Sequence, residues 1–300
     1  MDLKTRTKYL KRASARVALH MAFWFIHRLP YKALKVVMHV FIFVWSRMAI
    51  RLRRIAHESL RIAFAKEMDE KKRRRIVRDC FENVGCSMVD LIYYSEYPAG
   101  VAKRFTIEGR EYLDRALAAG RGVVVVTAHF GNFCLMMLNL AQLGYKVNCI
   151  IRRTRDEDIG QTIFKAMSKV GVHPIYSIPA RQSVQQSLKA LRQNEILCIL
   201  LDQHFGSGSG VYVDFFGRKA ATATGPIVFA NRTGSPILPV FTVRDGADYK
   251  IIIEPPFELQ AAEDDQAFLE KNVTGITRII EGYIRRYPAE WGWMHRRWKN

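Results

Sequence analysis

The chain has 300 residues, 49% of them hydrophobic, which is enough apolar material for the core of one large domain and argues against a disordered chain. Its formal net charge of +19 at pH 7 favours an anionic partner, such as membrane phosphate, nucleic acid or an acidic protein. The five cysteines are odd in number and match no zinc or redox spacing, so they are interpreted as reduced thiols.

The positive charge is concentrated at the start of the chain. Residues 1–54 contain 13 lysines and arginines but a single acidic residue, and they include two aromatic-rich apolar runs, 17–27 and 36–46. Each run is shorter than the roughly 18–20 residues that a membrane-spanning helix needs, and no small-residue cleavage site follows either one. We therefore predict that residues 1–50 form a basic amphipathic helical segment on an anionic membrane surface. The alternative is an ordinary pair of helices packed on the rest of the chain.

The remaining residues, 51–300, are predicted to form one α/β domain. Residues 50–97 have a helical pattern of mixed polarity. Beyond Gly109, apolar runs rich in β-branched residues alternate with helical stretches. This alternation predicts a central, mostly parallel mixed sheet flanked by helices. The runs lie at 120–129, 146–152 and 195–203, and the helical stretches at Ile159–Val170 and Arg181–Asn194.

The last hundred residues continue the α/β pattern. Residues 204–225 are rich in glycine and serine and are predicted to form a loop, followed by a short helix at 226–234. Two strands then pair through a turn at Gly246, and a long helix covers about 264–286. The aromatic and basic tail, 291–300, suits either an interfacial anchor or packing on the sheet.

His129 is the first residue that suggests chemistry. It follows a buried apolar run and precedes an apolar helix, a position typical of sites at the edge of an open α/β sheet. Gly131 gives the connection flexibility, and Asn132 is a suitable N-cap whose helix could offer N–H groups to an oxyanion. Taken alone, His129 could equally be a histidine satisfied inside the core.

Several short sequence segments, or blocks, around and after His129 occur in a characteristic order. They read HFGN, LLDQ, GVYVDFFGRKAATATG, RTGSPILPVF, IIIEPPFEL and EWGWMHRRWK. In this order they strongly resemble the late acyltransferases of lipid A biosynthesis, the lauroyl/myristoyl transferase family of the lysophospholipid acyltransferase superfamily. The resemblance covers nearly the whole chain, including the basic and aromatic N-terminus.

This resemblance implies a glycerolipid acyltransferase-like fold and a reaction. A fatty acyl group would pass from a thioester, on acyl carrier protein or coenzyme A, to a hydroxyl of a lipid A precursor or related lipid. The reaction would take place at the cytoplasmic face of the bacterial inner membrane, with no metal, no bound cofactor and no nucleic acid. In the family, a histidine is the general base, which implies this role for His129, with Asn132 and the helix N-terminus helping the oxyanion.

Cys134 is the main departure from the family pattern. Four residues separate it from His129, and the family has an acid at this position. Three hypotheses follow. Another carboxylate could serve His129, with Asp202 preferred over Asp214. Cys134 could be a nucleophile that forms an acyl-enzyme, which requires a lowered thiol pKa. Alternatively, the chain could be a catalytically weak or inactive lipid-binding homologue.

The other predicted binding residues are assigned on weaker grounds. Lys169 stands where the family normally has an arginine, and Arg153 lies at a strand end where it could hold an anionic group. Arg218 could receive headgroup phosphates, although a solvated loop is an equal alternative. The complete predicted substrate-binding set is Gly131, Cys134, Arg153, Lys169, Gln203 and Arg218.

Overall fold

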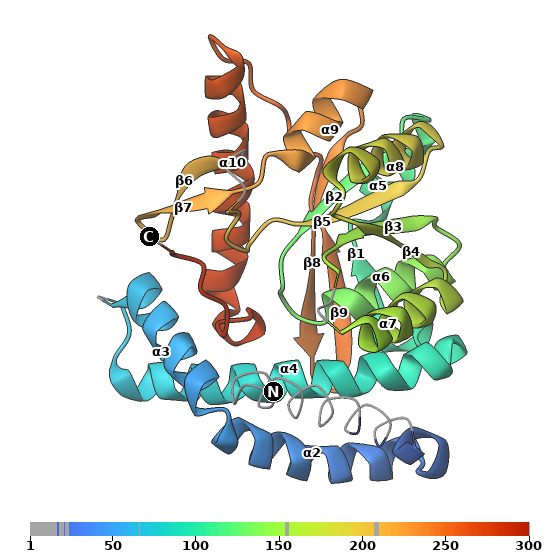
Figure 1. The fold of residues 1–300 in the computed structure, drawn as a ribbon, viewed down its shortest axis with the longest axis vertical. Coiled ribbons are helices and arrows are strands. Elements are labelled where there is room, and N and C mark those ends of the chain that lie inside the picture. Colours follow the sequence, from blue (N-terminus) through green and yellow to red (C-terminus); the bar gives the residue numbers. More distant parts are fainter. Residues whose placement is uncertain are drawn as a thin grey trace, which may run out of the picture.

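The fold is given by a computed structural model, which describes residues 17, 21, 24–65, 67–153, 156–206 and 210–299 (Figure 1). A seven-stranded sheet forms its centre, in the order β1-β9-β8-β2-β5-β3-β4. Strands β8, β2, β5, β3 and β4 run parallel, whereas β9 is antiparallel to β8, and β1 is parallel to β9. The strands are β1 Phe105–Glu108, β2 Val123–Thr127, β3 Val147–Ile151, β4 Val172–Tyr176, β5 Ile196–Leu200, β8 Ile237–Asp245 and β9 Asp248–Ile253.

Helices cover both faces of this sheet, which explains why its central strands are continuous apolar runs. All five residues of β2 are buried, because one face packs against each of the two main core clusters. The predicted mostly parallel mixed sheet flanked by helices is confirmed. The covering helices are α5 Arg110–Ala118, α6 Phe133–Gln142, α7 Glu157–Lys169, α8 Ala180–Arg192, α9 Gly225–Thr233 and α10 Asp265–Arg286.

The predicted loop at 204–225 is wrong over most of its length. An antiparallel hairpin occupies it, with β6 at Val211–Phe215 and β7 at Arg218–Thr222. Burial alternates along β6, as a strand with one covered face requires. The turn uses positive φ angles at Phe216 (55°) and Gly217 (72°), so a two-residue connection closes the hairpin.

In the part of the chain that the structure describes, residues 24–28 are helical and three longer helices follow before the sheet. They are α2 Tyr31–Met48, α3 Ile50–Phe64 and α4 Glu70–Glu96, followed by the short turns η1 Pro98–Gly100 and η2 Ala102–Arg104. In Figure 1, α4 runs along the edge of the sheet at which β8 ends, and α2 lies on the far side of α4. A Cβ atom on Gly85 would lie 2.6 Å from the Ile42 side chain, so the glycine allows α2 to approach α4 closely.

Part of the predicted membrane segment, 1–50, lies outside the described residues, namely 1–16, 18–20 and 22–23. Among the residues that are described, no single helix combines the length and apolar character of a membrane span. Helices α2 and α3 meet those criteria only as a pair, bent by 76°. The boundary between residues 50 and 51 stays a prediction.

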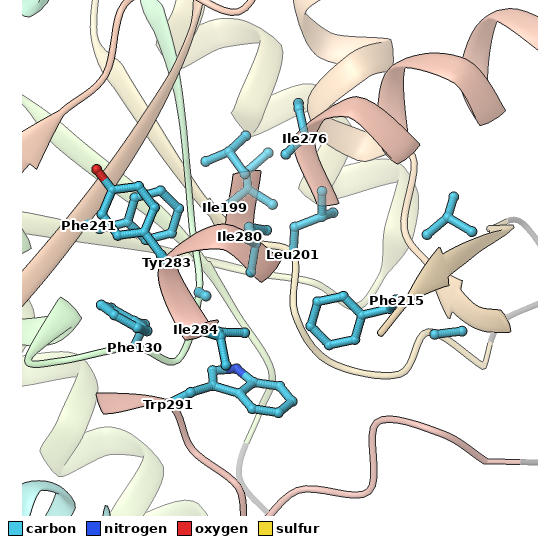
Figure 2. Close-up of a cluster of buried hydrophobic side chains, with 14 of the residues drawn as sticks. Phe130, Ile199, Leu201, Phe215, Phe241, Ile276, Ile280, Tyr283, Ile284 and Trp291 are labelled. Atoms are coloured by element: carbon cyan, nitrogen blue, oxygen red, sulfur yellow. The ribbon is translucent and has the colours of Figure 1, made fainter. Parts of the chain in front are cut away.

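The C-terminal tail packs inside the molecule, which decides between the two alternatives for residues 291–299. Trp291, Trp293 and Arg297 are at most 1% exposed, after the short turn η3 Pro288–Glu290. Trp291 pairs with Phe130 in an isolated antiparallel bridge. Figure 2 shows Trp291 beside Ile284 of α10, in the cluster that also holds Phe130. The tail therefore reaches the connection between β2 and α6.

Candidate active site

His129 lies on the connection that leaves β2 and enters α6. Gly131 shapes this connection, because its φ of 56° is left-handed and an added Cβ would overlap the Thr242 carbonyl oxygen at 1.8 Å. Asn132 ends the connection as the N-cap of α6, and its Oδ1 accepts from the Leu135 N–H at 3.1 Å. The predicted capping role of Asn132 is confirmed.

A buried carboxylate contacts His129. Asp202 lies two residues after the end of β5. Because β5 pairs in parallel with β2, His129 and Asp202 both lie at the same edge of the sheet. His129 Nδ1 lies 2.9 Å from Asp202 Oδ1, and the Asp202 side chain is 2% exposed. The indole Nε1–H of Trp291 donates to Asp202 Oδ2 at 2.7 Å. Both carboxylate oxygens therefore have a partner.

This pairing fixes the tautomer of His129. An ionised carboxylate only accepts hydrogen bonds, so Nδ1 carries the proton and Nε2 keeps its lone pair. The side chain is 35% exposed. The amide nitrogen of Gln203 lies 3.1 Å from Nε2 and donates to it. The ring nitrogen suited to remove a proton is thus Nε2, which is not bonded to Asp202. The exposed amide of Gln203 contacts this nitrogen.

The charges of the pair support each other. Burial alone would lower the pKa of His129, but the charge of Asp202 and the hydrogen bond to it outweigh burial, so the pKa is raised. Burial alone would raise the pKa of Asp202, but His129 and Trp291 together bring it below its ordinary value. Asp202 is therefore ionised at neutral pH and stabilises the imidazolium that forms when His129 takes a proton.

Cys134 has the opposite character. It is the second residue of α6 and packs against the apolar cluster behind the sheet. Burial raises the pKa of its thiol to about 12, so the group is a neutral thiol at pH 7. The nucleophile hypothesis requires a lowered thiol pKa, and Cys134 does not have one.

The N-terminus of α6 offers backbone donors next to His129. Within the described residues, the N–H groups of Phe133 and Cys134 have no acceptor. The Asn132 side chain is buried and fully engaged, because its Nδ2 donates to the Ser87 carbonyl at 3.2 Å and to the Tyr249 hydroxyl at 3.4 Å. Its amide consequently shapes the helix start, while the free N–H groups suit an anion.

The remaining predicted residues have contacts elsewhere. Arg153 lies over the Tyr176 ring at 4.3 Å, and the Lys169 ammonium pairs with Glu96 at 3.0 Å. Arg218 opens β7 and is exposed. None of the contacts of these three residues joins them to His129 in the part of the chain that is described.

Asp214, the weaker candidate for the carboxylate, is also occupied elsewhere. Its Oδ1 accepts from the Gly217 N–H at 2.8 Å and closes the β6–β7 turn. The carboxylate beside His129 is that of Asp202.

The sequence predictions missed the contribution of the C-terminal tail to the site. Besides Trp291, the Gly292 N–H donates to the His129 carbonyl at 3.0 Å, and the Gly131 N–H donates to the Glu290 carbonyl at 2.9 Å. Arg297 donates to the Gln203 carbonyl at 3.1 Å. The tail was recognised as a motif, but nothing in its sequence shows which loop it meets.

Comparison with known proteins shows the family of this chain. A sequence model of the family described as bacterial lipid A biosynthesis acyltransferase matches residues 2–300. The lipid A biosynthesis lauroyltransferase of Escherichia coli (strain K12) is 28% identical over 284 residues, covering 92% of this chain and 88% of that protein. The lipid A biosynthesis palmitoleoyltransferase of the same strain is 27% identical over 249 residues, covering 82% and 78%.

A more distant relative acts on another lipid. The phosphatidylinositol mannoside acyltransferase of Mycobacterium tuberculosis (strain CDC 1551 / Oshkosh) is 25% identical over 197 residues, covering 64% of this chain and 59% of that protein. The match of the family along almost the entire sequence decides the assignment. This chain belongs to the bacterial lipid A biosynthesis acyltransferases, enzymes that transfer an acyl group to a lipid.

Proposed function

We propose that this chain transfers a fatty acyl group from a thioester to a hydroxyl of a lipid A precursor or a closely related lipid, with His129 as the general base and Asp202 as its carboxylate partner. The observation that carries the proposal is the hydrogen-bonded pair of His129 and Asp202, 2.9 Å apart, beside a helix N-terminus with free N–H groups. Family membership supplies the reaction class.

The chemistry begins with the acceptor hydroxyl, which is a poor nucleophile at neutral pH. The hydroxyl would displace the amide of Gln203 from His129 Nε2 and give its proton to that nitrogen as it attacks the thioester carbonyl. Asp202 stabilises the imidazolium through its charge and its hydrogen bond to Nδ1. In this way proton removal and bond formation occur together.

The tetrahedral intermediate carries negative charge on the former carbonyl oxygen. The N–H groups of Phe133 and Cys134 at the start of α6 are the donors that suit it, with the positive end of the helix dipole behind them. When the intermediate collapses, the thiolate leaves and receives the proton from His129. Asn132 contributes by fixing the first turn of α6.

Asp202 also explains how His129 can act as a base although Cys134 stands at the usual acid position. In this arrangement the orienting acid comes from the end of β5, across the sheet edge, and not from the first turn of α6. A neutral thiol at position 134 then leaves the imidazole oriented. The proposal thus favours an active enzyme over the inactive lipid-binding alternative, to which Cys134 points when considered alone.

We further propose that acyl carrier protein is the donor and that the enzyme works at the cytoplasmic face of the inner membrane. The net charge of +19 suits both an acidic carrier and an anionic leaflet. Exposed apolar residues gather on α2, which supports a helix lying in the headgroup layer. They include Val36, Val40, Phe41, Phe43, Val44, Trp45 and Met48.

Replacement of His129 by alanine tests the proposal. Purified wild-type and His129→Ala chains are supplied with an acyl carrier protein thioester or acyl coenzyme A and a disaccharide lipid precursor, and the product is measured by mass spectrometry. Loss of the base should reduce turnover by at least about 10²–10⁴-fold. His173→Ala, at an exposed histidine of β4, is the matched control and should keep full activity.

Two results would contradict the proposal. Unchanged turnover in His129→Ala would remove the base from its role. A wild-type chain that binds lipid vesicles but forms no acylated product from either donor would instead support the inactive lipid-binding homologue.

A further inference from the structure

A second buried carboxylate lies on α4, outside the pair described above. Asp90 is 0% exposed. The hydroxyl of Tyr31, in α2, donates to its Oδ1 at 2.7 Å, and the hydroxyl of Tyr249, in β9, donates to its Oδ2. The ammonium of Lys35, also in α2, lies 3.9 Å from Oδ1. A charge removed from water is tolerated only when such partners surround it, so α2 and β9 are both needed around Asp90.

The hydrogen bonds continue from Asp90 to the active site. The Tyr249 hydroxyl, which donates to Asp90, accepts from Asn132 Nδ2 at 3.4 Å and from Arg244 at 3.0 Å. Asn132 caps α6 through the Leu135 N–H. Four side chains in series, those of Tyr31, Asp90, Tyr249 and Asn132, therefore connect the start of α2 to the helix turn that carries the proposed oxyanion donors.

The two tyrosines are held as donors. Burial, the hydrogen bond to Asp90 and its charge raise the pKa of Tyr31, and burial with the same charge raises the pKa of Tyr249. Their hydroxyls stay protonated at neutral pH, which fixes the direction of each hydrogen bond toward the carboxylate. Asp90 accordingly orients Tyr249, and the lone pairs of the Tyr249 hydroxyl accept from Asn132 and Arg244.

The other face of α2 is the one that remains uncovered. Val36, Val40 and Met48 are each more than 60% exposed, whereas Leu34 and Ile42 are buried against the rest of the molecule. In Figure 1, α2 is the outermost layer beyond α4. A force that moves or seats α2 at a lipid surface therefore acts directly on Tyr31 and Lys35.

We propose that Asp90 is a positioning residue for the transfer reaction, which couples the seating of α2 to the geometry of Asn132 and the first turn of α6. The inference rests on the proposed function, since it assigns that turn to the oxyanion. Without the carboxylate, Tyr249 loses its fixed orientation, and the cap of α6 loosens. A displacement near 1 Å at a reacting centre can cost on the order of 10²-fold in rate.

Three variants of the full chain test the coupling. Asp90→Asn keeps the shape but removes the charge, and Tyr31→Phe removes one donor while leaving Tyr249 on Asp90. Tyr93→Phe is the matched control, because its ring lies 4.8 Å from that of Tyr31 and its hydroxyl has no hydrogen bond among the described residues. Tyr31→Phe keeps the test valid if Asp90→Asn fails to fold.

Two measurements are made on each variant. The first is kcat and KM with the acceptor presented in anionic vesicles and, separately, dispersed in detergent. The second is hydrogen exchange of a peptide covering residues 132–138, with and without vesicles, which reports on the α6 cap without any turnover. Circular dichroism confirms that each variant is folded.

We expect Asp90→Asn to lower kcat by about 10–100-fold, with the KM for the acyl donor within about twofold of wild type and faster exchange in the 132–138 peptide. Tyr31→Phe should have a smaller effect in the same direction and should lose the stimulation by vesicles. The control should match the wild type. Equal kcat and equal exchange in Asp90→Asn, Tyr31→Phe and Tyr93→Phe would overturn the coupling.

The two proposals fail in different ways. If the wild-type chain transfers no acyl group, the proposed function fails, while the exchange measurement still decides whether Asp90 holds the cap. If the wild type is active and His129→Ala is not, but the Asp90 and Tyr31 variants behave as wild type, only the coupling is wrong.

Discussion

The imidazole of His129 is held by a carboxylate from a different strand, and this changes what its neighbours on α6 must do. In a helix turn that carries both base and acid, the turn alone orients the imidazole. Here Asp202 and Trp291 fix the orientation from outside α6, at 2.9 and 2.7 Å. At the scale of single residues, the side chain of Cys134 is then not needed to orient the imidazole.

Asp202→Asn is expected to reduce kcat by about 10³–10⁴-fold, as when the orienting aspartate of a serine protease triad loses its charge. The sign of the pH effect follows from the pKa of His129. Asp202 raises that pKa and burial lowers it, so without the charge the pKa falls. The acidic limb of the kcat/KM profile, where neutral His129 is required, should therefore move to lower pH.

This shift separates a lost charge from a lost fold. A partly unfolded variant would keep the limb in place and lower only the plateau. A limb that moves upward, or a residual activity equal to wild type, would contradict the assignment of Asp202.

Cys134→Ala and Cys134→Ser should keep activity within about threefold of wild type, since the neutral thiol has no step to perform. Cys134→Ala leaves a small gap in the apolar cluster, with a cost near 1 kcal/mol or less in the free energy of unfolding. Steady-state kinetics and thermal unfolding measure both effects. Loss of turnover in the two variants, with normal folding, would revive the covalent mechanism.

At the scale of elements, the β2–α6 connection and the C-terminal tail determine the geometry of the site. The β2–α6 connection places His129, and the C-terminal tail clamps that connection through the bonds of Gly131 and Gly292. The Gly131 N–H and the Gly292 N–H donate in opposite directions across the bridge between Phe130 and Trp291. His129 is therefore held on a backbone that is hydrogen-bonded on both sides.

Gly131→Ala should lower the free energy of unfolding by about 3 kcal/mol or more and remove activity, because a Cβ would overlap the Thr242 carbonyl oxygen at a left-handed φ. Gly120→Ala is the matched control. Its φ is also left-handed, at 73°, but nothing lies within 4 Å of the added Cβ. It should cost about 1 kcal/mol in chemical denaturation and leave turnover intact. Equal costs at the two positions would contradict the close-contact explanation.

The elements also show what the sequence can and cannot predict. Strands β2 and β5 are detected because burial on both faces leaves nearly continuous apolar runs, and β3 is detected because its run is apolar except for Asn148. The β6–β7 hairpin escapes detection because its glycine-rich approach resembles a loop, although Val211, Val213 and Phe215 alternate with exposed residues.

For the site, His129, Asp202 and Gln203 could be proposed because each follows a strand whose carboxyl end lies at the same edge. The pairing with Trp291 could not, because an indole 89 positions away from Asp202 has no local signature of its partner. The contact exists through the fold of α10 and the tail, which brings the end of the chain back to the sheet.

The whole molecule combines a positive charge of +19 with an uncovered apolar face on α2. At the proposed membrane, this charge would attract the chain to an anionic surface over a Debye length of about 10 Å at 0.1 M salt, and the apolar side chains would hold it there. The Asp90 network lies between this face and the active site. The molecule is thus layered from the outer helix to the reacting groups.

Binding to phosphatidylglycerol vesicles should weaken as salt rises from 0.1 to 0.5 M and should be weak for zwitterionic vesicles. Phe43→Glu, at a residue 58% exposed on α2, should reduce the partition coefficient about tenfold or more. Tyr212→Glu, at a residue 64% exposed on β6, is the matched control and should bind as wild type. Vesicle sedimentation measures all three chains. Equal losses in the two variants would show that added negative charge, and not the α2 face, controls binding.

The indole of Trp291 also sets the moment at which the enzyme can become competent during its synthesis. His129 and Asp202 leave the ribosome long before the tryptophan that donates to Asp202 and the backbone that bridges Phe130. A nascent chain or a fragment that stops before residue 291 has its base and its acid but not the clamp that holds them. Truncated translation products should therefore be unable to consume thioesters. A reporter protein fused to the N-terminus would also be present in these truncated products, so its signal would overestimate the amount of working enzyme.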